Sequence, residues 1–406
     1  MHLKKHILVI SQYFYPEQFR INDISTEWKK RGYRVTVITG IPNYPQGKFY
    51  KGYGFFKKIK ENFNGIDIIR LPIIPRGKNK FGLALNYISF VVSGFFWKIF
   101  TRINADLVFI FEVSPMTQAL PGVWYAKKRR IPCYLYVQDL WPENFVMFSG
   151  ISNKKIIGVI NRMVNYIYAN STKILATSES FVKKIANRGI ALNKLLYWPQ
   201  YAEDFYVPSK KNTKKSSSFN IIFTGNIGYA QGLDILPRVA FDLKNDRKNV
   251  IFNIVGDGRF RSELIKEINH LEVSYMFNLI DRQAPEKIPE LLAENDAAFL
   301  SFINDPLFEM TIPAKLQSYL ACGIPIIASV AGESERIITE SGSGMACPIG
   351  NIKAVSDIIK TMMSMDKSEL IQMGKRGLEY YNKNFNKNEL LDCLDAIFDS
   401  DEVLGH

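Results

Sequence analysis

Residues 6–39 read HILVISQYFYPEQFRINDISTEWKKRGYRVTVIT, and this stretch decides the fold. His6–Ser11 and Tyr33–Thr39 are almost continuous runs of apolar and β-branched residues, as in strands that are buried on both faces of a parallel sheet. Between them, Asp23–Arg31 has the spacing of an amphipathic helix, and Gly32 ends it. Strand, helix and strand in this order predict a βαβ unit, and therefore an α/β fold with a doubly wound parallel sheet.

The same alternation continues along the first half of the chain and restarts in the second half. Further strand-like runs in the first half are Ile66–Pro72, Leu107–Phe111, Cys133–Val137 and Ile174–Thr177. Those in the second half are Asn220–Thr224, Val250–Val255, Phe277–Leu279, Ala297–Phe302 and Pro325–Ala328. Between the two sets, Val207–Ser218 is polar and rich in lysine and serine, which is typical of a linker.

We therefore expect two Rossmann-like domains with ligands bound in the cleft between them, because 406 residues exceed what one hydrophobic core usually supports. The predicted boundaries are 1–205 for the first domain, 206–218 for the linker and 219–385 for the second domain. The final segment, 386–406, is expected to form a helix, and packing on the first domain is one arrangement open to it.

Composition and charge narrow the function classes. The apolar fraction is 47%, which excludes a disordered chain, and none of the four cysteines has CxxC spacing, which argues against a disulfide framework or a zinc site. Residues 1–205 carry 30 Lys/Arg against 12 Asp/Glu, net +18, whereas residues 219–406 carry 18 against 27, net −9. The basic half fits a nucleic acid, an anionic membrane or a diphosphate-bearing substrate, although a merely soluble lysine-rich surface stays open. No nucleic-acid-binding motif accompanies it.

The segment Phe81–Trp97 contains 17 residues without a charge, between Lys80 and Lys98. Its length is at the lower limit for crossing a bilayer, and a spanning helix would split a βαβ unit. A buried crossover helix and a helix with an aromatic face in the bilayer surface are the two other interpretations. The start of the chain forms a strand and is not a secretory signal, so we expect a cytoplasmic protein.

Ligands of doubly wound sheets bind at the carboxyl ends of the strands, so we searched the loops that follow them. The loop Gln12–Asp23 lacks the GxGxxG pattern, and no acidic residue ends the strand before Gly40, so a dinucleotide oxidoreductase is disfavoured. Arg20 and Asn22 lie at the start of a helix, where an anion is stabilised. Asp139 follows a buried strand and is placed to take a proton from a hydroxyl, although such residues also cap helices.

The second half offers two glycine-bearing loops, TGNIG (224–228) and VGDGR (255–259), each after a strand. Glycines there let backbone amides approach a phosphate closely, although tight turns use the same residues. The segment EMTIPAK (309–315) opens a helix, so its amides and Lys315 are placed to hold a diphosphate, with Arg282 as a further cation.

Taken together, these segments resemble the retaining GT-B glycosyltransferases of family 4, and most of all the bacterial branch that makes O-antigen and capsule repeats, which includes N-acetyl-L-fucosamine transferases. The resemblance rests on YFYPEQFRINDI (13–24), TGIPNYPQG (39–47), VQDLWPE (137–143), FTGNIGYAQGLDIL (223–236), IVGDG (254–258) and TIPAKLQSYLACGIPIIAS (311–329).

The resemblance implies a UDP-sugar held by the second domain, an acceptor held by the first, retention of anomeric configuration, and no cofactor or metal ion. It implies catalytic roles for Asp139, Lys315 and Arg282. The implied donor-binding residues are Gly225, Asn226, Gly228, Gln231, Gly256, Asp257, Gly258, Arg259, Glu309, Thr311, Ile312, Pro313, Ser318 and Glu333. The implied acceptor-binding residues are Glu17, Arg20, Asn22, Asn43 and Tyr44.

The chain departs from the broader family in four places. The glycine pair of the first loop is replaced around Arg20, and the histidine before the acceptor-loop Asp is Gln138. The Arg and Lys of the phosphate-binding loop fall on Asn226 and Gln231. The Glu-x7-Glu pair is broken, because its first member aligns with Met310, beside Glu309, and its second aligns with Ser318. These changes place more weight on Arg282 and Lys315.

From these features we expect a peripheral enzyme on the cytoplasmic face of the membrane. It would transfer an N-acetylated sugar, with N-acetyl-L-fucosamine as the first choice, from UDP to a lipid-diphosphate-linked saccharide. Two alternatives remain. One is an isomerase resembling UDP-N-acetylglucosamine 2-epimerase, whose chemistry depends on histidines that this chain mostly lacks. The other is a catalytically silent sugar-nucleotide-binding subunit, which the broken Glu pair favours.

Overall fold

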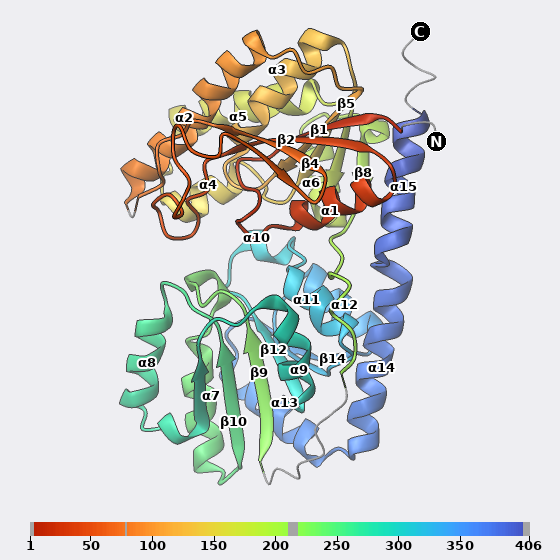
Figure 1. Cartoon of the computed structure of the whole chain (residues 1–406). Coiled ribbons are helices and arrows are strands. Elements are labelled where there is room, and N and C mark those ends of the chain that lie inside the picture. The colour runs from red at the N-terminus through yellow and green to blue at the C-terminus, as the bar shows by residue number, and fades with distance from the viewer. Residues whose placement is uncertain (1–3, 78, 210–217, 401–406) are drawn as a thin grey trace. The chain divides into compact units, whose positions relative to one another are not determined.

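The computed structural model describes residues 4–77, 79–209 and 218–400 and divides the chain into two compact units (Figure 1). Unit 1 is Met1–Trp198 and unit 2 is Pro199–His406. Most of the predicted linker, 210–217, lies outside the described residues, as do the last residues of the predicted final helix, 401–406.

Unit 1 contains one sheet of eight strands in the order β3-β4-β2-β1-β5-β6-β7-β8. Its strands are β1 (His6–Ile10), β2 (Arg34–Gly40), β3 (Lys60–Phe63), β4 (Ile66–Leu71), β5 (Leu107–Glu112), β6 (Cys133–Val137), β7 (Lys173–Ala176) and β8 (Leu195–Tyr197). The pairs are parallel except for β3 with β4, which is antiparallel. The six predicted strands are confirmed to within a residue at each end. β3 and β8 escaped prediction, because one is a polar edge strand and the other has only three residues.

The helices of unit 1 cover both faces of this sheet and are α1 (Arg20–Lys30), α2 (Lys80–Phe100), α3 (Leu120–Arg129), α4 (Glu143–Ser149), α5 (Lys154–Ala169) and α6 (Glu179–Ala186). The helix α1 begins at Arg20, three residues before the predicted start at Asp23. The sequence did not mark this start, because the residue before the helix, Phe19, provides no side-chain cap. Trp28 of α1 packs edge-on against Phe109 of β5, with 4.7 Å between ring centroids.

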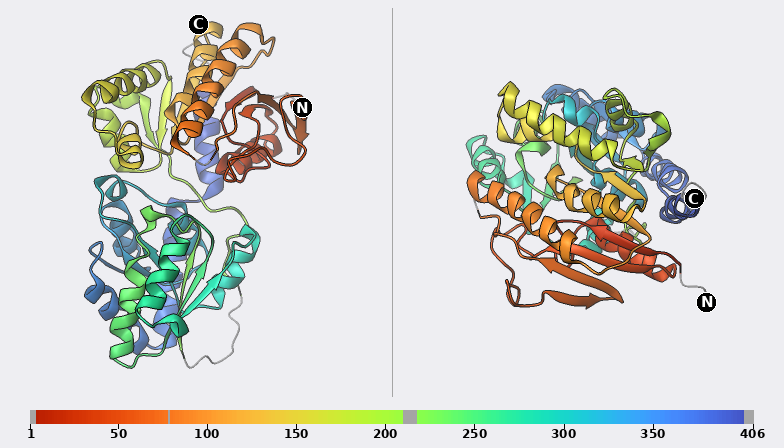
Figure 2. Two further views of the ribbon diagram at one scale, coloured as in Figure 1. Left: turned by 90° about the vertical axis from the view of Figure 1, so that its left-hand side faces the viewer. Right: turned by 90° about the horizontal axis from the view of Figure 1, so that it is seen from above.

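The helix α2 lies along α3 (Figure 2). A Cβ atom at Gly94 of α2 would come within 2.3 Å of the Pro121 ring in α3, so only glycine allows this close approach. A helix is present at the predicted segment Phe81–Trp97 and runs from Lys80 to Phe100 between β4 and β5, but only 17% of its most apolar window is buried, so the interpretation as a buried crossover helix is wrong.

Unit 2 contains a second parallel sheet, in the order β11-β10-β9-β12-β13-β14. Its strands are β9 (Phe219–Thr224), β10 (Val250–Val255), β11 (Phe277–Ile280), β12 (Ala297–Ser301), β13 (Ile326–Ser329) and β14 (Gly344–Cys347). The longer helices are α7 (Ile235–Asn245), α8 (Arg261–His270), α9 (Ile288–Ala293), α11 (Ala314–Ala321), α12 (Glu333–Ser341) and α13 (Ile352–Ser364), and a short helix α10 spans Pro306–Glu309. The predicted strands are again confirmed, and β14 is the one that the sequence analysis missed.

The end of the chain forms two helices, α14 (Lys367–Asn384) and α15 (Lys387–Ser400), and α15 lies within the segment 386–406 that was expected to be helical. The ammonium of Lys387 pairs with Asp204 at 2.8 Å, and the hydroxyl of Tyr381 accepts a hydrogen bond from the amide of Ala202 at 3.1 Å. The segment that enters unit 2 and the helices that end it are thus tied together. Packing of α15 on the first domain stays a prediction.

Candidate active site

In unit 1 the strand order reverses between β1 and β5, so the loops after these strands and after β6 lie where a doubly wound sheet binds its ligands. Asp139 stands two residues after β6. Its Oδ2 accepts a hydrogen bond from the backbone N–H of Ser114, which follows β5, at 2.7 Å. Burial raises the pKa of Asp139, and the hydrogen bonds from Ser114 and Asn144 only partly oppose this. Asp139 is therefore a fixed carboxylate with increased basicity.

A second carboxyl group, Glu112, lies beside Asp139 and was not predicted. It is the last residue of β5, it is fully buried, and β5 pairs with β6 in register. Desolvation and the charge of Asp139 raise the pKa of Glu112 well above its usual range, despite nearby N–H groups of Asp139 and Gln138. Burial and the neighbouring Asp139 carboxylate thus both favour the protonated, neutral form of Glu112.

We predict that Glu112→Gln becomes more stable relative to the wild type as the pH rises from about 5 to 8. The folded-state pKa of Glu112 lies above its unfolded value, so wild-type stability is lost above the unfolded pKa of about 4.3, and glutamine removes this loss. Each pH unit is worth about 1.4 kcal/mol, or about 3–6 °C in melting temperature. Melting curves of both proteins across this range provide the measurement. A difference that stays constant with pH would show that Glu112 is not held neutral.

The predicted acceptor residues after β1 and β2 are brought together by hydrogen bonds. Buried Glu17 accepts the backbone N–H groups of Asn43 and Tyr44 at 2.8 and 2.6 Å, and burial raises the pKa of Glu17 to about 7. Asn22 in the first turn of α1 accepts the N–H of Tyr15 at 3.2 Å and donates to the carbonyl of Glu17 at 2.7 Å. These side chains hold the two loops in place, while the ring of Tyr44 stays partly accessible.

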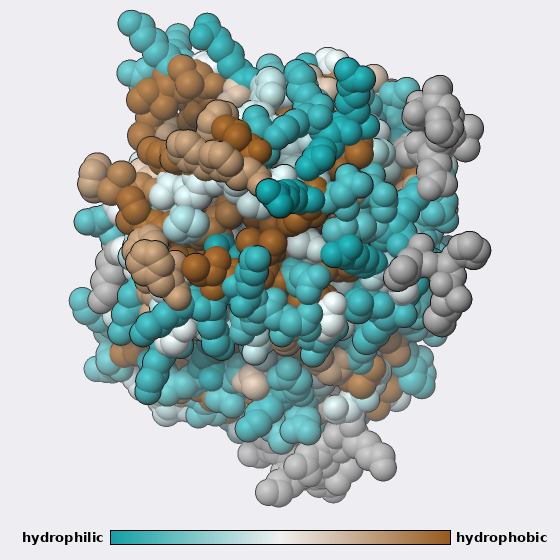
Figure 3. All heavy atoms as spheres, turned by 45° about the horizontal axis from the view of Figure 1, so that its top comes forward, coloured by the Kyte–Doolittle hydropathy of each residue, from teal (hydrophilic) through white to brown (hydrophobic). Residues whose placement is uncertain are grey.

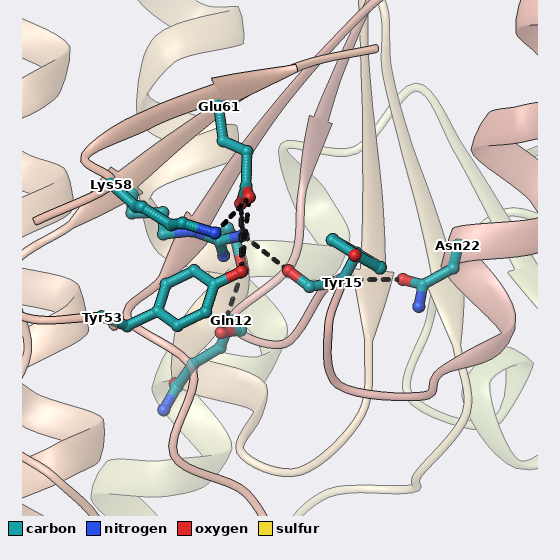
Figure 4. A network of polar contacts seen from close by, with 8 residues as sticks. Gln12, Tyr15, Asn22, Tyr53, Lys58 and Glu61 are labelled. Carbon is teal, nitrogen blue, oxygen red and sulfur yellow. Dashed lines mark hydrogen bonds and ion pairs between the residues drawn. The ribbon is translucent and has the colours of Figure 1, made fainter. Parts of the chain in front are cut away.

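A polar network fastens the loop after β1 to the edge of the sheet (Figure 4). The buried guanidinium of Arg70, on β4, donates to the carbonyl of Tyr15 at 2.6 Å and to Glu61, on β3, at 2.7 Å. The hydroxyl of Tyr53 and the ammonium of Lys58 both lie 3.3 Å from the Glu61 carboxylate. The unpredicted strand β3 therefore fixes the position of the predicted acceptor loop.

An arginine and three aromatic rings extend this group toward Asp139. Tyr13 lies 5.6 Å from Tyr44 between ring centroids, and the guanidinium of Arg76 lies 5.0 Å from the centre of the Tyr44 ring. Tyr87 of α2 hydrogen-bonds to Tyr13, and its pKa is raised by burial and also by the charge of Asp139. Arg76 and Tyr87 were missed, because nothing in their local sequence marks them, whereas Tyr13 was quoted within the segment 13–24 but given no role of its own. Arg20, at the first position of α1, is half-buried.

In unit 2 the corresponding reversal lies between β9 and β12, and the two glycine loops end the neighbouring strands β9 and β10. Gly256 has φ of +148°, and a Cβ atom there would come within 1.9 Å of the Gly225 carbonyl oxygen. A Cβ atom at Gly258 would lie 2.2 Å from the carbonyl oxygen of Ile227. The predicted loops are thus packed backbone against backbone, and both positions require glycine. Gly225 and Asn226 remain exposed beside them.

Lys315, at the second position of α11, reaches these loops. Its ammonium donates a hydrogen bond to the Oε1 of Gln231 and lies 4.0 Å from the centre of the Phe223 ring. A Cβ atom at Gly225 would be 3.8 Å from the same nitrogen. Burial lowers the pKa of Lys315 to about 7. The structure therefore brings together three predicted residues, Lys315, Gln231 and Gly225, and an anion bound there would favour the protonated form of the Lys315 amine.

The segment before α11 is tied to the start of α12. The hydroxyl of Ser334 donates to the carbonyl of Thr311 at 3.0 Å, and a Cβ atom at Gly332 would lie 2.0 Å from the carbonyl oxygen of Glu309. Glu333 is buried and pairs with Arg336 at 2.8 Å. Ile312 is also buried and Pro313 caps α11, whereas the Oγ of Ser318 bonds to the Ala314 carbonyl within that helix at 3.2 Å.

The other predicted cations, Arg259 and Arg282, are exposed. Arg259 lies in the loop after β10, together with the exposed carboxylate of Asp257, and Arg282 lies two residues after β11. The amide of Gly256 bonds to the carbonyl of Ile280 at 3.0 Å, which brings the Arg282 loop next to the glycine loop. The structure gives no direct contact between Arg282 and Lys315 within the described residues.

A cavity of about 200 Å³ opens at the strand-order reversal of unit 2, lined by Gly232, Phe302, Ile303, Asn304 and Ser329 among others. It adjoins Gln231 in sequence but includes none of the predicted donor residues. Within residues 4–77, 79–209 and 218–400, no three His, Cys, Asp or Glu side chains are grouped so as to hold a metal ion.

Comparison with known proteins assigns the class. The family described as Glycosyltransferase Family 4 matches residues 19–200, and the family described as Glycosyl transferases group 1 matches residues 208–379. These two regions follow each other and cover most of the chain. The chain is a family 4- and group 1-like glycosyltransferase with the GT-B fold.

Individual relatives agree with this class. The chain is 25% identical over 314 residues to the Escherichia coli protein assigned as colanic acid biosynthesis glycosyl transferase WcaI, covering 73% of this chain and 75% of the relative. Among solved structures, sucrose-phosphate synthase from Thermosynechococcus elongatus has a TM-score of 0.77 at 12% identity, covering 99% and 100% of the two chains. HepE from Anabaena in complex with UDP has a TM-score of 0.71 at 14% identity, covering 97% and 99%.

Proposed function

We propose that this enzyme transfers a sugar from a UDP-sugar to a lipid-diphosphate-linked saccharide during synthesis of a bacterial surface polysaccharide. The observation that carries the donor half is Lys315, a half-buried lysine whose ammonium is held against the glycine loops at the ends of β9 and β10. A uridine nucleotide is supported by the likeness to HepE, whose structure contains UDP, and a surface polysaccharide by the likeness to WcaI. An N-acetylated sugar, with N-acetyl-L-fucosamine first, follows from the sequence resemblance.

In the proposed reaction, unit 2 binds the UDP diphosphate through the backbone around Gly225 and through Lys315. The bond from the anomeric carbon to the UDP oxygen breaks, and its electron pair leaves with UDP. A new bond forms between that carbon and the acceptor oxygen, on the face that retains the anomeric configuration. Lys315 stabilises the charge that develops on the leaving diphosphate, and Arg282 adds to this field. No metal ion has a part in this scheme.

In unit 1, Asp139 would accept the proton from the acceptor hydroxyl. Its position is fixed by the Ser114 N–H, and its raised pKa improves it as a base near neutral pH. The acceptor diphosphate is a partner for the guanidinium of Arg76, and the rings of Tyr44 and Tyr87 provide surfaces against which a sugar packs. The acceptor is membrane-bound, so we place the enzyme on the cytoplasmic face of the membrane.

The test is a transfer assay with purified protein, a panel of UDP-N-acetyl sugars and lipid-diphosphate-linked saccharides, in the presence of a chelator. We expect UDP release that requires both substrates and one glycosylated product. Conversion of the UDP-sugar without acceptor would instead support the epimerase-like alternative. Tight UDP binding with no product for any pair would support the silent subunit, and either result would overturn the proposal.

A further inference from the structure

The helix α2 presents an apolar surface that unit 1 leaves uncovered. Seven of its large apolar side chains are between 41% and 76% exposed: Phe81, Ile88, Val92, Phe95, Phe96, Ile99 and Phe100. Only 17% of its most apolar 18-residue window is buried, and the helix is long and apolar enough to cross a membrane by length and composition. Isolated exposed apolar residues are normal, but seven on one helix form a patch that needs a partner.

The opposite face of α2 is built into unit 1. Buried Asn86 accepts a hydrogen bond from the side chain of Gln12 at 2.7 Å and donates to the carbonyl of Ile74 at 2.6 Å. Phe90 is fully buried, and Gly94 contacts Pro121 of α3. Crossing a bilayer would expose this polar and packed face to lipid and would break the crossover between β4 and β5. The patch therefore suits a surface on which the helix lies flat.

Aromatic and cationic side chains gather at the C-terminal end of α2. Phe95 packs edge-on against Trp124 of α3, with 5.7 Å between ring centroids, and the ammonium of Lys98 lies 5.0 Å from the centre of the Phe95 ring. The ammonium of Lys128 donates to the carbonyls of Lys98 and Ile99 at 3.3 and 3.2 Å. The run Lys127–Arg130 is exposed throughout. Rings beside lysine and arginine are the composition of a membrane–water interface.

The patch continues at the N-terminal end of α2. The ammonium of Lys80 donates to the carbonyl of Ser149, at the end of α4, at 3.2 Å, which joins the two helices. Phe148 of α4 and Val159 of α5 are each 62% exposed. Figure 3 shows apolar side chains gathered on one side of the molecule, with hydrophilic ones around them. We name this whole area, from Phe81 and Phe148 to Phe100 and Arg130, the α2 surface.

We infer that the α2 surface docks on an anionic phospholipid bilayer, with the rings of α2 in the headgroup region and the lysines and arginines beside them on the lipid phosphates. The charge supports this occupant, because residues 1–205 carry a net charge of +18. The inference deepens the proposed function by naming the surface of the enzyme that would bind the membrane. It rests on the proposed function in one respect, because the lipid-linked acceptor is the reason why the enzyme needs a membrane.

The test is co-sedimentation of the full-length protein with vesicles of phosphatidylcholine alone or with about 30 mol% phosphatidylglycerol added. We expect the protein to bind the anionic vesicles and to bind neutral vesicles at least about tenfold more weakly. About 0.5 M NaCl should weaken binding to the anionic vesicles. Two double variants, Phe96→Ser with Phe100→Ser and Lys127→Glu with Arg130→Glu, are each expected to lose at least about tenfold in partitioning.

A matched control replaces exposed apolar residues of unit 2, Tyr275→Ser with Ile371→Ser, which are 67% and 44% exposed. This control should bind vesicles as the wild type does. All variants are checked for folding by their thermal shift with UDP, which the α2 surface should not affect. Loss of vesicle binding and loss of nucleotide binding are therefore separate readouts, so failure of this inference is distinguishable from failure of the proposed function.

Three results would overturn the inference. One is equal binding of wild type and both double variants, or no binding at all. Another is extraction-resistant insertion of α2 that protects it from protease, which would mean that the helix spans the bilayer. The third is a dimer that buries the α2 surface and dissociates in the Phe96→Ser, Phe100→Ser variant, which would mean that a second copy of the chain is the partner.

Discussion

Lys315→Met is expected to weaken UDP binding by about 10- to 100-fold and to abolish the pH dependence of that binding. The lost contact is a charge-assisted hydrogen bond to the diphosphate, and such bonds contribute about 1.5–3 kcal/mol. Met has nearly the same length as the aliphatic part of Lys and suits the environment around Phe223, so the fold should be kept. Titration calorimetry with UDP measures the effect, and Lys353→Met, on the exposed face of α13, is the control.

The pH dependence follows from burial, which lowers the pKa of Lys315 to about 7 in the free protein. At pH 8 the amine is mostly neutral, and a bound diphosphate raises its pKa, so binding takes up a proton. Wild-type affinity for UDP should therefore fall between about pH 7 and 9, whereas the variant should show a flat profile. The free energy of unfolding moves in the opposite direction and rises with pH above the folded-state pKa of Lys315. The reason is that the folded protein then keeps the amine neutral while the unfolded chain still binds the proton. Identical pH profiles for wild type and variant would remove Lys315 from the diphosphate site.

Asp139→Asn is expected to lower turnover by about 10²–10⁴-fold while leaving UDP affinity within about twofold of the wild type. Asn has the same shape and keeps an oxygen for the Ser114 N–H, but it cannot take up a proton. Steady-state rates and UDP titrations on the same preparation separate the two quantities.

The control for this variant is Asp67→Asn, which changes an exposed carboxylate on β4. Its turnover should equal that of the wild type. If Asp139→Asn kept most of the activity, or lost UDP affinity in proportion to turnover, Asp139 would not act as the base in the transfer step.

Much of the fold could be predicted because strands that are buried on both faces leave a continuous apolar signal. β6 carries that signal along its whole length, β1 and β10 carry it except at His6 and Asn253, and the predicted ends of all three agree with the structure to within a residue. β3 does not, because its sequence KENF is polar and it pairs on one side as an edge strand. Edge position depends on the arrangement of the other strands, which local composition does not encode.

The residues of the candidate site also divide into those that the sequence could predict and those that it could not. Asp139 and the glycine loops follow predicted strands, so the rule that ligands bind at carboxyl ends located them. Glu112 also ends a strand, but the predicted strand stopped at Phe111, and Glu112 was not singled out as a carboxyl group beside Asp139. Arg76 and Tyr87 come from a loop and a helix that converge on Tyr44 and Tyr13 only through the tertiary fold. Their part in the site required the three-dimensional structure.

The most direct test of the central claim, a UDP-sugar site in unit 2, is a thermal-shift screen of the purified protein against UDP, GDP, ADP and several UDP-N-acetyl sugars without metal. At about a hundredfold excess over the dissociation constant, binding stabilises the folded state by about 2.7 kcal/mol, or about 5–10 °C. We predict a clear shift with UDP and its sugar derivatives, a smaller one with GDP or ADP, and a reduced one for Lys315→Met. An equal or larger shift with GDP or ADP, or no shift with any nucleotide, would contradict the account.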